Sequence, residues 1–124
     1  MAQKANARMV LETEALNESA DRAADFLRAV SHPGRLRIIC ALIDGERSAS
    51  ELARQAQLSA TGLSQHAAVL ESEGLIARRR DAQSILYRLV APEAKALAKL
   101  LYQLFCKPAR AHGERRVPKS GVTR

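Results

Sequence analysis

The hydrophobic period of this chain changes at Gly74, and that change limits the folds that the chain can adopt. Before Gly74, apolar residues recur every three or four positions, which is typical of helices. After it, residues 75–80 and 84–89 alternate apolar and polar side chains, as strands do, and residues 81–83 connect them. The sequence therefore predicts a mainly α domain that carries a β-hairpin.

Capping signals predict two helices in the first third of the chain. Asn17 can cap a helix that runs to about Val30. A second helix is expected from about Pro33 to Ile43, because proline suits the first turn of a helix. The apolar face expected for the first helix is Ala20, Ala23, Ala24, Leu27 and Val30. The inner face expected for the second is Leu36, Ile39, Cys40 and Ile43.

The next two helices are predicted to form a helix-turn-helix. Ser48 and Glu51 have the spacing of a capping box, in which each side chain satisfies a backbone donor of the other, so a third helix is expected over 49–55. Ser59 can cap a fourth helix that ends near Glu73. Its core-facing residues are Leu63, Ala67 and Leu70. A turn of about four residues joins the two helices, as in DNA-binding proteins.

A last helix is expected from Pro92 to Cys106, after the hairpin. Its apolar residues repeat at near-heptad spacing at Ala94, Leu97, Leu101 and Leu104. Leu100 and Phe105 widen this stripe beyond the need of one small core, which favours a dimer interface. In the hairpin, Ile85, Tyr87 and Leu89 are expected to share one face.

A chain of 124 residues is long enough for one compact domain with a modest core and too short for two cores of ordinary size. We expect residues 1–16 to be a flexible N-terminal arm, either frayed or an added helix. Residues 17–106 are expected to form one winged helix-turn-helix domain for DNA binding and dimerisation, with about five helices. Residues 107–124 contain prolines and glycines with few apolar residues, and we expect a disordered basic tail.

The charge supports a polyanionic partner only weakly. Residues 107–124 have six basic residues and one acidic residue, which give +5 of the net charge of +7. No apolar run reaches the roughly 18 residues of a membrane span, so we expect a cytoplasmic protein, associated with the nucleoid when bound to DNA, and no membrane partner. Without a glycine-rich phosphate loop or a nucleophile beside a base, we expect neither an enzyme nor a cofactor.

The fourth helix is the candidate for reading DNA. Its outward residues near the N-terminal end are small or hydrogen-bonding, as close approach to the major groove requires. These residues are Ala60, Thr61, Ser64 and Gln65, with His66 beside them. A solvated polar face is the alternative interpretation, and His66 is expected mainly as a structural hydrogen-bonding residue.

The hairpin adds basic side chains directly after this helix. Arg78, Arg79 and Arg80 lie on its first strand and Gln83 at its tip. Phosphate contacts from such a wing would hold the reading helix in register on double-stranded DNA. The alternative interpretation is that these charged side chains are simply solvent-exposed and have no role in DNA binding.

With these elements in order, residues 20–106 resemble the ArsR/SmtB family of bacterial winged-helix repressors. The resemblance is carried by Ser31 to Ile39, by Leu63-Ser64-Gln65-His66 with Val69-Leu70, by Glu73 to Ile76, and by Tyr87-Arg88-Leu89. It implies a homodimer whose first and last helices form the interface, and which leaves a two-fold operator when it senses an inducer. Residues 81–83 replace the glycine-containing turn common in the family.

Many members of that family sense metals, but this chain lacks their ligand sets. The third helix has no cysteine pair, and the last helix has no histidine and only Glu93 as an acid. His32, His66 and His112 fall in a loop, the reading helix and the tail. Because a stable zinc site needs about four converging ligands, we expect no metal site.

Cys40 and Cys106 are the candidate sensor. A cytoplasm keeps thiols reduced, so any bond between the two would be conditional. Cys40 also suits the alternative role of a small core residue. A direct bridge needs Cα atoms within about 7 Å, whereas a polysulfide link tolerates a wider gap.

The cysteine positions and residues 80–87 resemble the sulfide-responsive subgroup of the family, the BigR, SqrR and YgaV type. That resemblance implies that reactive sulfur species join Cys40 to Cys106 and weaken operator binding. Two alternatives remain open. One is a repressor that senses arsenite, another thiophilic ion or general oxidants through the same cysteines, and the other is a winged-helix protein-interaction module that does not bind DNA.

Overall fold

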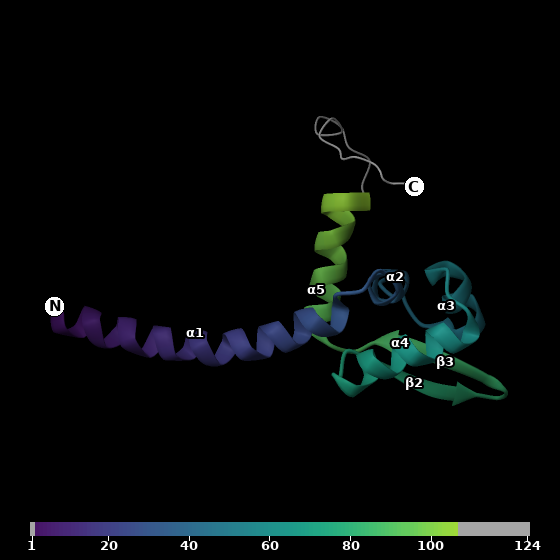
Figure 1. Cartoon of the computed structure of the whole chain (residues 1–124), viewed down its shortest axis with the longest axis horizontal. Coiled ribbons are helices and arrows are strands. Elements are labelled where there is room, and N and C mark those ends of the chain that lie inside the picture. The colour runs from purple at the N-terminus through teal and green to yellow at the C-terminus, as the bar shows by residue number, and fades with distance from the viewer. Residues whose placement is uncertain (1, 107–124) are drawn as a thin grey trace.

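The computed structural model describes residues 2–106, and side chains from residue 12 onward. Figure 1 shows a small body from which two helices extend. The elements are, in order, α1 (Ala2–Val30), α2 (Pro33–Ala41), β1 (Arg47–Ser48), α3 (Ala49–Ala56), α4 (Ala60–Ser72), β2 (Ile76–Asp81), β3 (Ser84–Leu89), α5 (Pro92–Leu101) and the π-helix η1 (Tyr102–Cys106). The chain therefore has the predicted winged helix-turn-helix fold. The tail expected over 107–124 lies outside the described residues.

The two helices of the helix-turn-helix, α3 and α4, are capped at their N-termini by the serine side chains that the sequence predicted. Ser48 Oγ accepts a hydrogen bond from the Glu51 backbone N at 3.2 Å, and Ser59 Oγ accepts one from Gly62 N at 2.9 Å. Gln57 ends α3 in the left-handed conformation with φ of 60°. These caps satisfy donors that an isolated helix end leaves unpaired, so the short α3 and α4 have defined starts.

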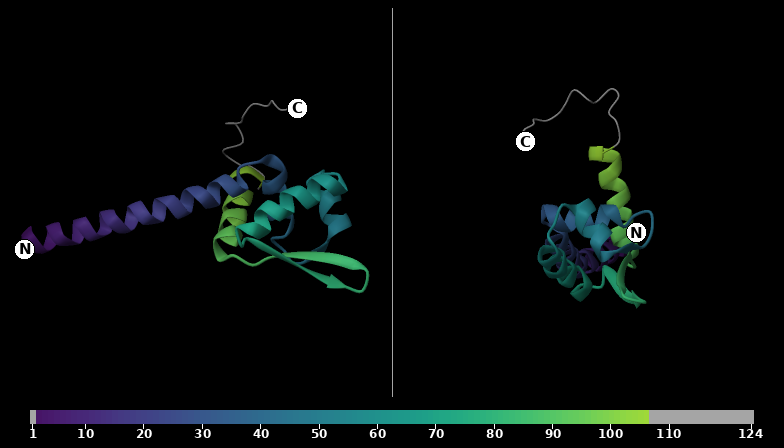
Figure 2. Two further views of the ribbon diagram at one scale, coloured as in Figure 1. Left: turned by 60° about the horizontal axis from the view of Figure 1, so that its bottom comes forward. Right: turned by 90° about the vertical axis from the view of Figure 1, so that its right-hand side faces the viewer.

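Helix α1 corrects the expected start at Asn17. It runs from Ala2 to Val30 without interruption, so Asn17 lies inside the helix. Between Ala2 and Val30 the sequence has no proline or glycine, and a capping residue starts a helix only where the preceding backbone leaves the helical conformation. Figures 1 and 2 show most of α1 extending away from the body.

The expected inner face of α2 is also corrected. The helix ends at Ala41, and the residues buried on it and just after it are Gly34, Ile38, Ile39 and Leu42. Of the four residues predicted, only Ile39 is fully buried, while Leu36, Cys40 and Ile43 are half-buried. The buried face of α2 contacts α3, α4 and α5. The period of the apolar residues alone did not indicate which side of α2 these three helices cover.

The apolar face expected on α1 is largely exposed. Ala20, Ala23, Ala24 and Leu27 are open to solvent, and only Ala29 and Val30 are buried. The reason is that α1 packs on α2 and α4 through its C-terminal end. On α4 the prediction is confirmed, because Leu63, Ala67 and Leu70 are all buried.

The wing is a three-stranded antiparallel sheet in the order β1-β3-β2. Strand β1, which pairs Arg47 with Tyr87, is an addition to the predicted hairpin. Asp81 was expected in the connection, but it pairs with Ser84 and leaves a tight turn in which Ala82 has φ of 59°. As predicted, the inner face of β3 packs on the core, with Tyr87 and Leu89 buried and Ile85 half-buried.

The last helix departs from the expected continuous helix. Ala94 and Ala98 are buried where α5 packs on α2, but after Leu101 the backbone widens into the π-helix η1. Leu104 and Phe105 are 63% and 77% exposed. In the described part of the chain, no helix is long and apolar enough to cross a lipid bilayer.

Candidate DNA-binding surface and thiol pair

Helix α4 presents its predicted reading residues on one exposed face. Ala60, Thr61, Ser64 and Gln65 are all exposed. Spacings of one and four residues place them together near the N-terminal end, which Ser59 caps. Because Leu63, Ala67 and Leu70 fix the opposite face in the core, these polar and small side chains are directed outward. The face has the chemistry for base and phosphate contacts.

Two of the wing arginines are held by carboxylates that the sequence analysis missed. Arg79 donates two hydrogen bonds to Glu46, with Nε to Oε2 at 2.8 Å and Nη2 to Oε1 at 2.9 Å. Arg78 Nε lies 3.3 Å from Glu71 Oε2. The hydrogen bond from Arg79 lowers the pKa of Glu46, and the charge of Arg79 adds to this effect. Any contact of these two arginines with a DNA phosphate would have to compete with their own acids.

The remaining wing residues of the prediction are Arg80 and Gln83, which are exposed near the hairpin tip. On β2, Arg78 and Arg80 lie on one face and Arg79 on the other, since strand side chains alternate. The three arginines are thus not one basic cluster. The two faces of the wing carry different parts of its charge.

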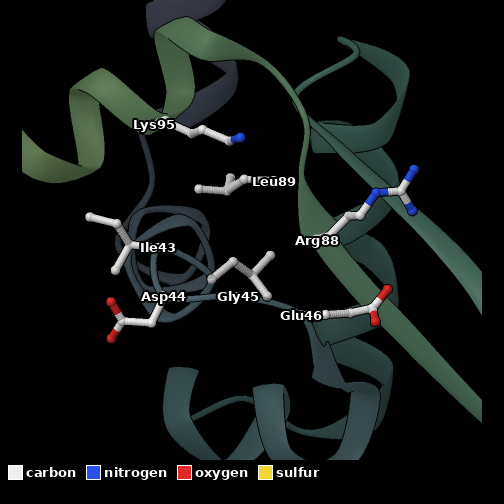
Figure 3. Close-up of a pocket in the computed structure, with 8 residues that line it drawn as sticks. Ile43, Asp44, Gly45, Glu46, Arg88, Leu89 and Lys95 are labelled. Atoms are coloured by element: carbon white, nitrogen blue, oxygen red, sulfur yellow. The ribbon is translucent and has the colours of Figure 1, made fainter.

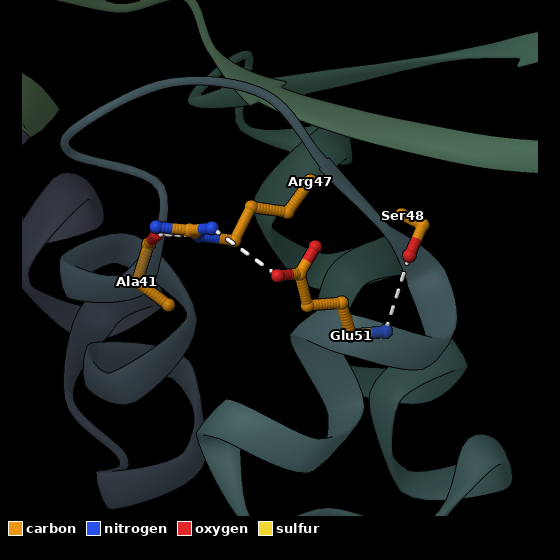
Figure 4. A network of polar contacts seen from close by, with 4 residues as sticks. All are labelled: Ala41, Arg47, Ser48 and Glu51. Atoms are coloured by element: carbon orange, nitrogen blue, oxygen red, sulfur yellow. Dashed lines mark hydrogen bonds and ion pairs between the residues drawn. The ribbon is translucent and has the colours of Figure 1, made fainter.

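Arg47 of β1 joins the end of α2 to α3 (Figure 4). Its Nε donates to the Ala41 carbonyl at the end of α2, at 2.8 Å, and its Nη1 lies 3.4 Å from Glu51 Oε2 on α3. Half of the predicted capping box is present, because Glu51 N donates to Ser48 while the Glu51 carboxylate pairs with Arg47. These contacts hold the start of α3 in place relative to the end of α2.

His66 sits on the side of α4 that faces α2. Its Nδ1 is 3.2 Å from Arg35 Nη1, and its ring centroid is 4.2 Å from that of His32. Partial burial lowers the pKa of His66, and the charges of His32, Arg35 and Arg37 lower it further. The side chain is half-buried, and these contacts suit the structural role expected for it.

Cys40 and Cys106, the two candidate sensor thiols, lie within range of electrostatic interaction. Burial raises the pKa of Cys40, and the charge of Cys106 raises it further. Both thiols are free, with Cys40 half-buried on α2 and Cys106 exposed at the end of η1. Helix α5 packs on α2, which carries Cys40, and η1 continues α5 as far as Cys106. The two thiols therefore differ in their access to solvent.

A hollow of about 320 Å³ lies where the loop after α2 meets β3 and α5 (Figure 3). Asp44 and Glu46 line it together with Arg88 and Lys95, over apolar atoms of Leu89. The charge of Arg88 contributes to lowering the pKa of Glu46. Acids and bases balance here, so the hollow selects neither anions nor cations. Across the residues whose side chains are described, no three histidine, cysteine or acidic side chains gather to hold a metal.

The chain is similar to known transcriptional regulators over most of its length. Residues 32–78 match the family described as bacterial regulatory protein, arsR family. The transcriptional activator HlyU of Vibrio cholerae is 36% identical over 97 residues, covering 78% of this chain and 90% of that protein. The regulator YgaV of Escherichia coli is 44% identical over 96 residues, covering 77% and 97% respectively.

Solved structures agree with these sequence relationships. Reduced HlyU from Vibrio cholerae superposes with a TM-score of 0.73 at 37% identity, over 76% of this chain and 99% of that one. The repressor BigR from Xylella fastidiosa gives a TM-score of 0.71 at 36% identity, over 77% and 98%. The family match, the sequence identities and the fold agree: the chain belongs to the ArsR/SmtB family of winged-helix transcriptional regulators.

Proposed function

We propose that this chain is a homodimeric repressor that binds operator DNA and releases it when reactive sulfur species bridge Cys40 and Cys106. The observation that carries the proposal is the packing of α5 on α2, because α2 carries Cys40 and η1 continues α5 as far as Cys106. The likeness to BigR, a repressor, and to YgaV supports the same assignment.

Operator recognition is assigned to α4 and the wing. Ala60, Thr61, Ser64 and Gln65 of α4 enter the major groove, while Arg78 to Arg80 and Gln83 contact backbone phosphates. His66 supports α4 from its inner side. In a two-fold dimer each half-site is read by one α4, so binding depends on the distance between the two reading helices.

The exposed Cys106 makes the first attack on a polysulfide. Its thiolate bonds to a sulfane sulfur, the polysulfide S–S bond breaks, and the shorter sulfide leaves with the electron pair. This step converts Cys106 into a persulfide. Cys40 is half-buried and its pKa is raised, so it stays protonated until the persulfide is beside it.

Cys40 then closes the bridge. It loses its proton to solvent and attacks Sγ of Cys106, and HS⁻ leaves as the disulfide forms. If a second sulfane sulfur has been added first, attack on the sulfur next to Sγ expels HS⁻ and leaves a trisulfide. In both cases two protein thiols are oxidised by two electrons and the polysulfide is reduced.

The bridge acts on DNA through the helices that it joins. Cys40 belongs to α2, which packs on α3 and α4, and Cys106 ends the segment proposed to pair with a second copy. A covalent link between them changes the orientation of α4, the proposed reading helix, relative to the dimer interface in each protomer. Because both heads must fit the operator together, a small displacement lowers affinity.

An operator-binding titration tests this proposal. The duplex is selected from random sequences by the reduced protein, and reduced and polysulfide-treated samples are titrated with intact mass measured on each. We expect treated protein to gain the mass of a bridge and to bind at least about tenfold more weakly. Cys40→Ser and Cys106→Ser are expected to bind DNA when reduced and to lose the response.

Ala41→Ser is the matched control, because it adds a hydroxyl beside Cys40 and keeps both thiols. It should respond as the unmodified protein does. A full response in either cysteine variant would refute the dithiol switch. Parallel samples with peroxide and arsenite separate sulfur sensing from the oxidant and thiophilic-ion alternatives. Loss of binding by Gln65→Ala and Arg80→Ala separates a DNA-binding regulator from a protein-interaction module.

A further inference from the structure

A chain of contacts links the end of α1 to the reading helix. Arg35, in the first turn of α2, donates from Nε to the Ala29 carbonyl near the end of α1 and places Nη1 3.2 Å from His66 Nδ1 on α4. The ring of His32 lies against His66 with centroids 4.2 Å apart. One guanidinium therefore connects three helices that carry different parts of the proposed function.

The contact requires a neutral His66. Arginine has only donors and remains charged, so Nδ1 of His66 must accept, and the ring hydrogen must be on Nε2. Protonation of His66 would place a hydrogen on Nδ1 against the N–H group of Arg35. It would also put two positive charges within hydrogen-bond distance of each other. The protonated ring thus loses the contact.

The surroundings of His66 leave little room for a rearrangement that keeps the contact. A Cβ built on Gly34 would lie 3.2 Å from His32 Nδ1, from His66 Cδ2 and from Leu58 Cδ2. His32 itself accepts a hydrogen bond from Gly34 N through Nδ1, at 2.9 Å. The start of α2 is therefore packed tightly on α4.

We propose that Arg35 is a positioning residue for the reading helix, acting through His66, and that protonation of His66 weakens operator binding. This rests on the proposed role of α4 as the DNA-reading helix and not on the thiol switch. Ala29 lies near the end of α1, whose exposed face is expected at the dimer interface. The contact thus connects α4 to α1, which is expected to help set the distance between the two reading helices of the dimer.

Three basic groups act on His66, and all of them come from α2 or from the residue just before it. His32 precedes α2, and Arg35 and Arg37 lie on α2. Partial burial is the first cause that keeps the pKa of His66 below its ordinary 6.5, and the three basic groups add to it. The ring is therefore neutral at pH 7 and above, and the contact is lost as the pH falls through its folded pKa. Because the unfolded chain takes up this proton first, acid also reduces stability.

The sign of the effect distinguishes the contact from ordinary charge attraction. A histidine that gains positive charge near DNA strengthens binding through phosphate attraction alone. The Arg35–His66 contact predicts the reverse. Relative to a variant that cannot be protonated, the unmodified protein should bind more weakly in acid.

His66→Asn provides that variant, because the Asn Oδ1 can accept from Arg35 close to the position of Nδ1. Operator affinity is measured for reduced protein between pH 5.5 and 8, on a duplex selected at pH 8. We expect the unmodified protein to lose about fivefold more affinity across this range than His66→Asn does. At pH 8 the two should bind within about threefold of each other.

Two controls isolate His66. His32→Asn keeps an acceptor for the start of α2, and His112→Asn changes the tail, so both should retain the pH response. A histidine NMR titration provides a readout without DNA: Arg35→Gln should raise the pKa of His66 while a thermal melt shows that the fold persists. The proposal is overturned if His66→Asn keeps the acid response, or if Arg35→Gln leaves the pKa of His66 unchanged. Failure of polysulfide to act on DNA binding would overturn only the thiol switch.

Discussion

At the scale of single residues, the environment of Cys40 suppresses its ionisation. Partial burial removes water that would stabilise a thiolate, and the nearby Cys106 adds a repulsive charge. Both effects raise the pKa above the ordinary 9.0. The neutral thiol is thus favoured by the fold below pH 9, and this contribution to stability is lost as the pH rises through the folded pKa.

This arrangement predicts a specific change in thiol reactivity. Since the thiolate is the form that alkylates, Cys40 should react with iodoacetamide at a higher pH than a solvent-exposed thiol. Cys106→Ser removes the charge but not the burial, so it should move the Cys40 profile part of the way toward lower pH. Peptide mass spectrometry over a pH series measures this shift.

Tyr102→Phe is the matched control for the alkylation experiment, because it changes the same turn and keeps Cys106. Its Cys40 profile should be that of the unmodified protein. An unchanged profile in Cys106→Ser would mean that the two thiols do not interact in solution. The thiol switch would then lose support.

At the scale of elements, the wing is restrained by acids on its neighbours. Glu46, in the loop before β1, holds Arg79, and Glu71 of α4 pairs with Arg78. The lowered pKa of Glu46 means that its pair persists above the ordinary value of 4.5 and is lost as the pH falls through the folded pKa. If Arg79 contacts DNA as proposed, a phosphate has to compete with Glu46 for it at neutral pH.

Removing that competition should strengthen DNA binding. Glu46→Gln takes away the charge that holds Arg79, so we expect operator affinity to rise about threefold. The slope of log affinity against log salt concentration should become steeper, by up to about the amount that one additional phosphate contact contributes. Fluorescence anisotropy at a series of salt concentrations measures both quantities.

Glu18→Gln removes the same charge from the exposed face of α1, away from the wing, and serves as the matched control. It should raise affinity less than Glu46→Gln and leave the salt dependence unchanged. Equal gains from the two variants would show a general charge effect. Arg79 would then not be a phosphate-binding residue.

At the scale of the whole molecule, two projecting helices expose apolar side chains that the body does not cover. Leu16 and Leu27 on α1 are 66% and 53% exposed, and Leu100 on α5 is 50% exposed. Leu104 and Phe105 extend this surface onto η1. Apolar surface on helices that leave the body suits association with a second copy, as proposed.

Charge placed on this surface should prevent association. Leu104→Glu with Phe105→Glu would bury two carboxylates in the proposed interface, which is strongly unfavourable without partners. We expect the unmodified protein to sediment as a dimer and the double variant as a monomer at the same concentration. Operator binding should fall with the dimer.

Gln103→Glu adds a charge to the same exposed turn and is the control for the sedimentation experiment. It replaces a polar residue, so it should remain dimeric. If the double variant sediments as a dimer, the interface lies elsewhere on the molecule. The proposed link between the thiol bridge and the two reading heads would then need a different path.

Local patterns predicted much of the fold because their causes are local. The caps at Ser48 and Ser59 depend on residues three positions away, and the core face of α4 follows from helical spacing. Two predictions were wrong for different reasons. The buried face of α2 depends on which helices pack on it, which the local sequence does not specify. The start of α1 was misplaced because no signal before Asn17 stops the helix.

The change of period at Gly74 and the capped helix pair before it were thus enough to determine a winged helix-turn-helix. Only the tertiary structure decided which charges are already paired. Arg79 with Glu46 and Arg35 with His66 are separated by 33 and 31 residues, and β1 pairs with β3 across the whole helix-turn-helix. No local periodicity carries information about such contacts, because they form only when the packed core brings the distant segments together.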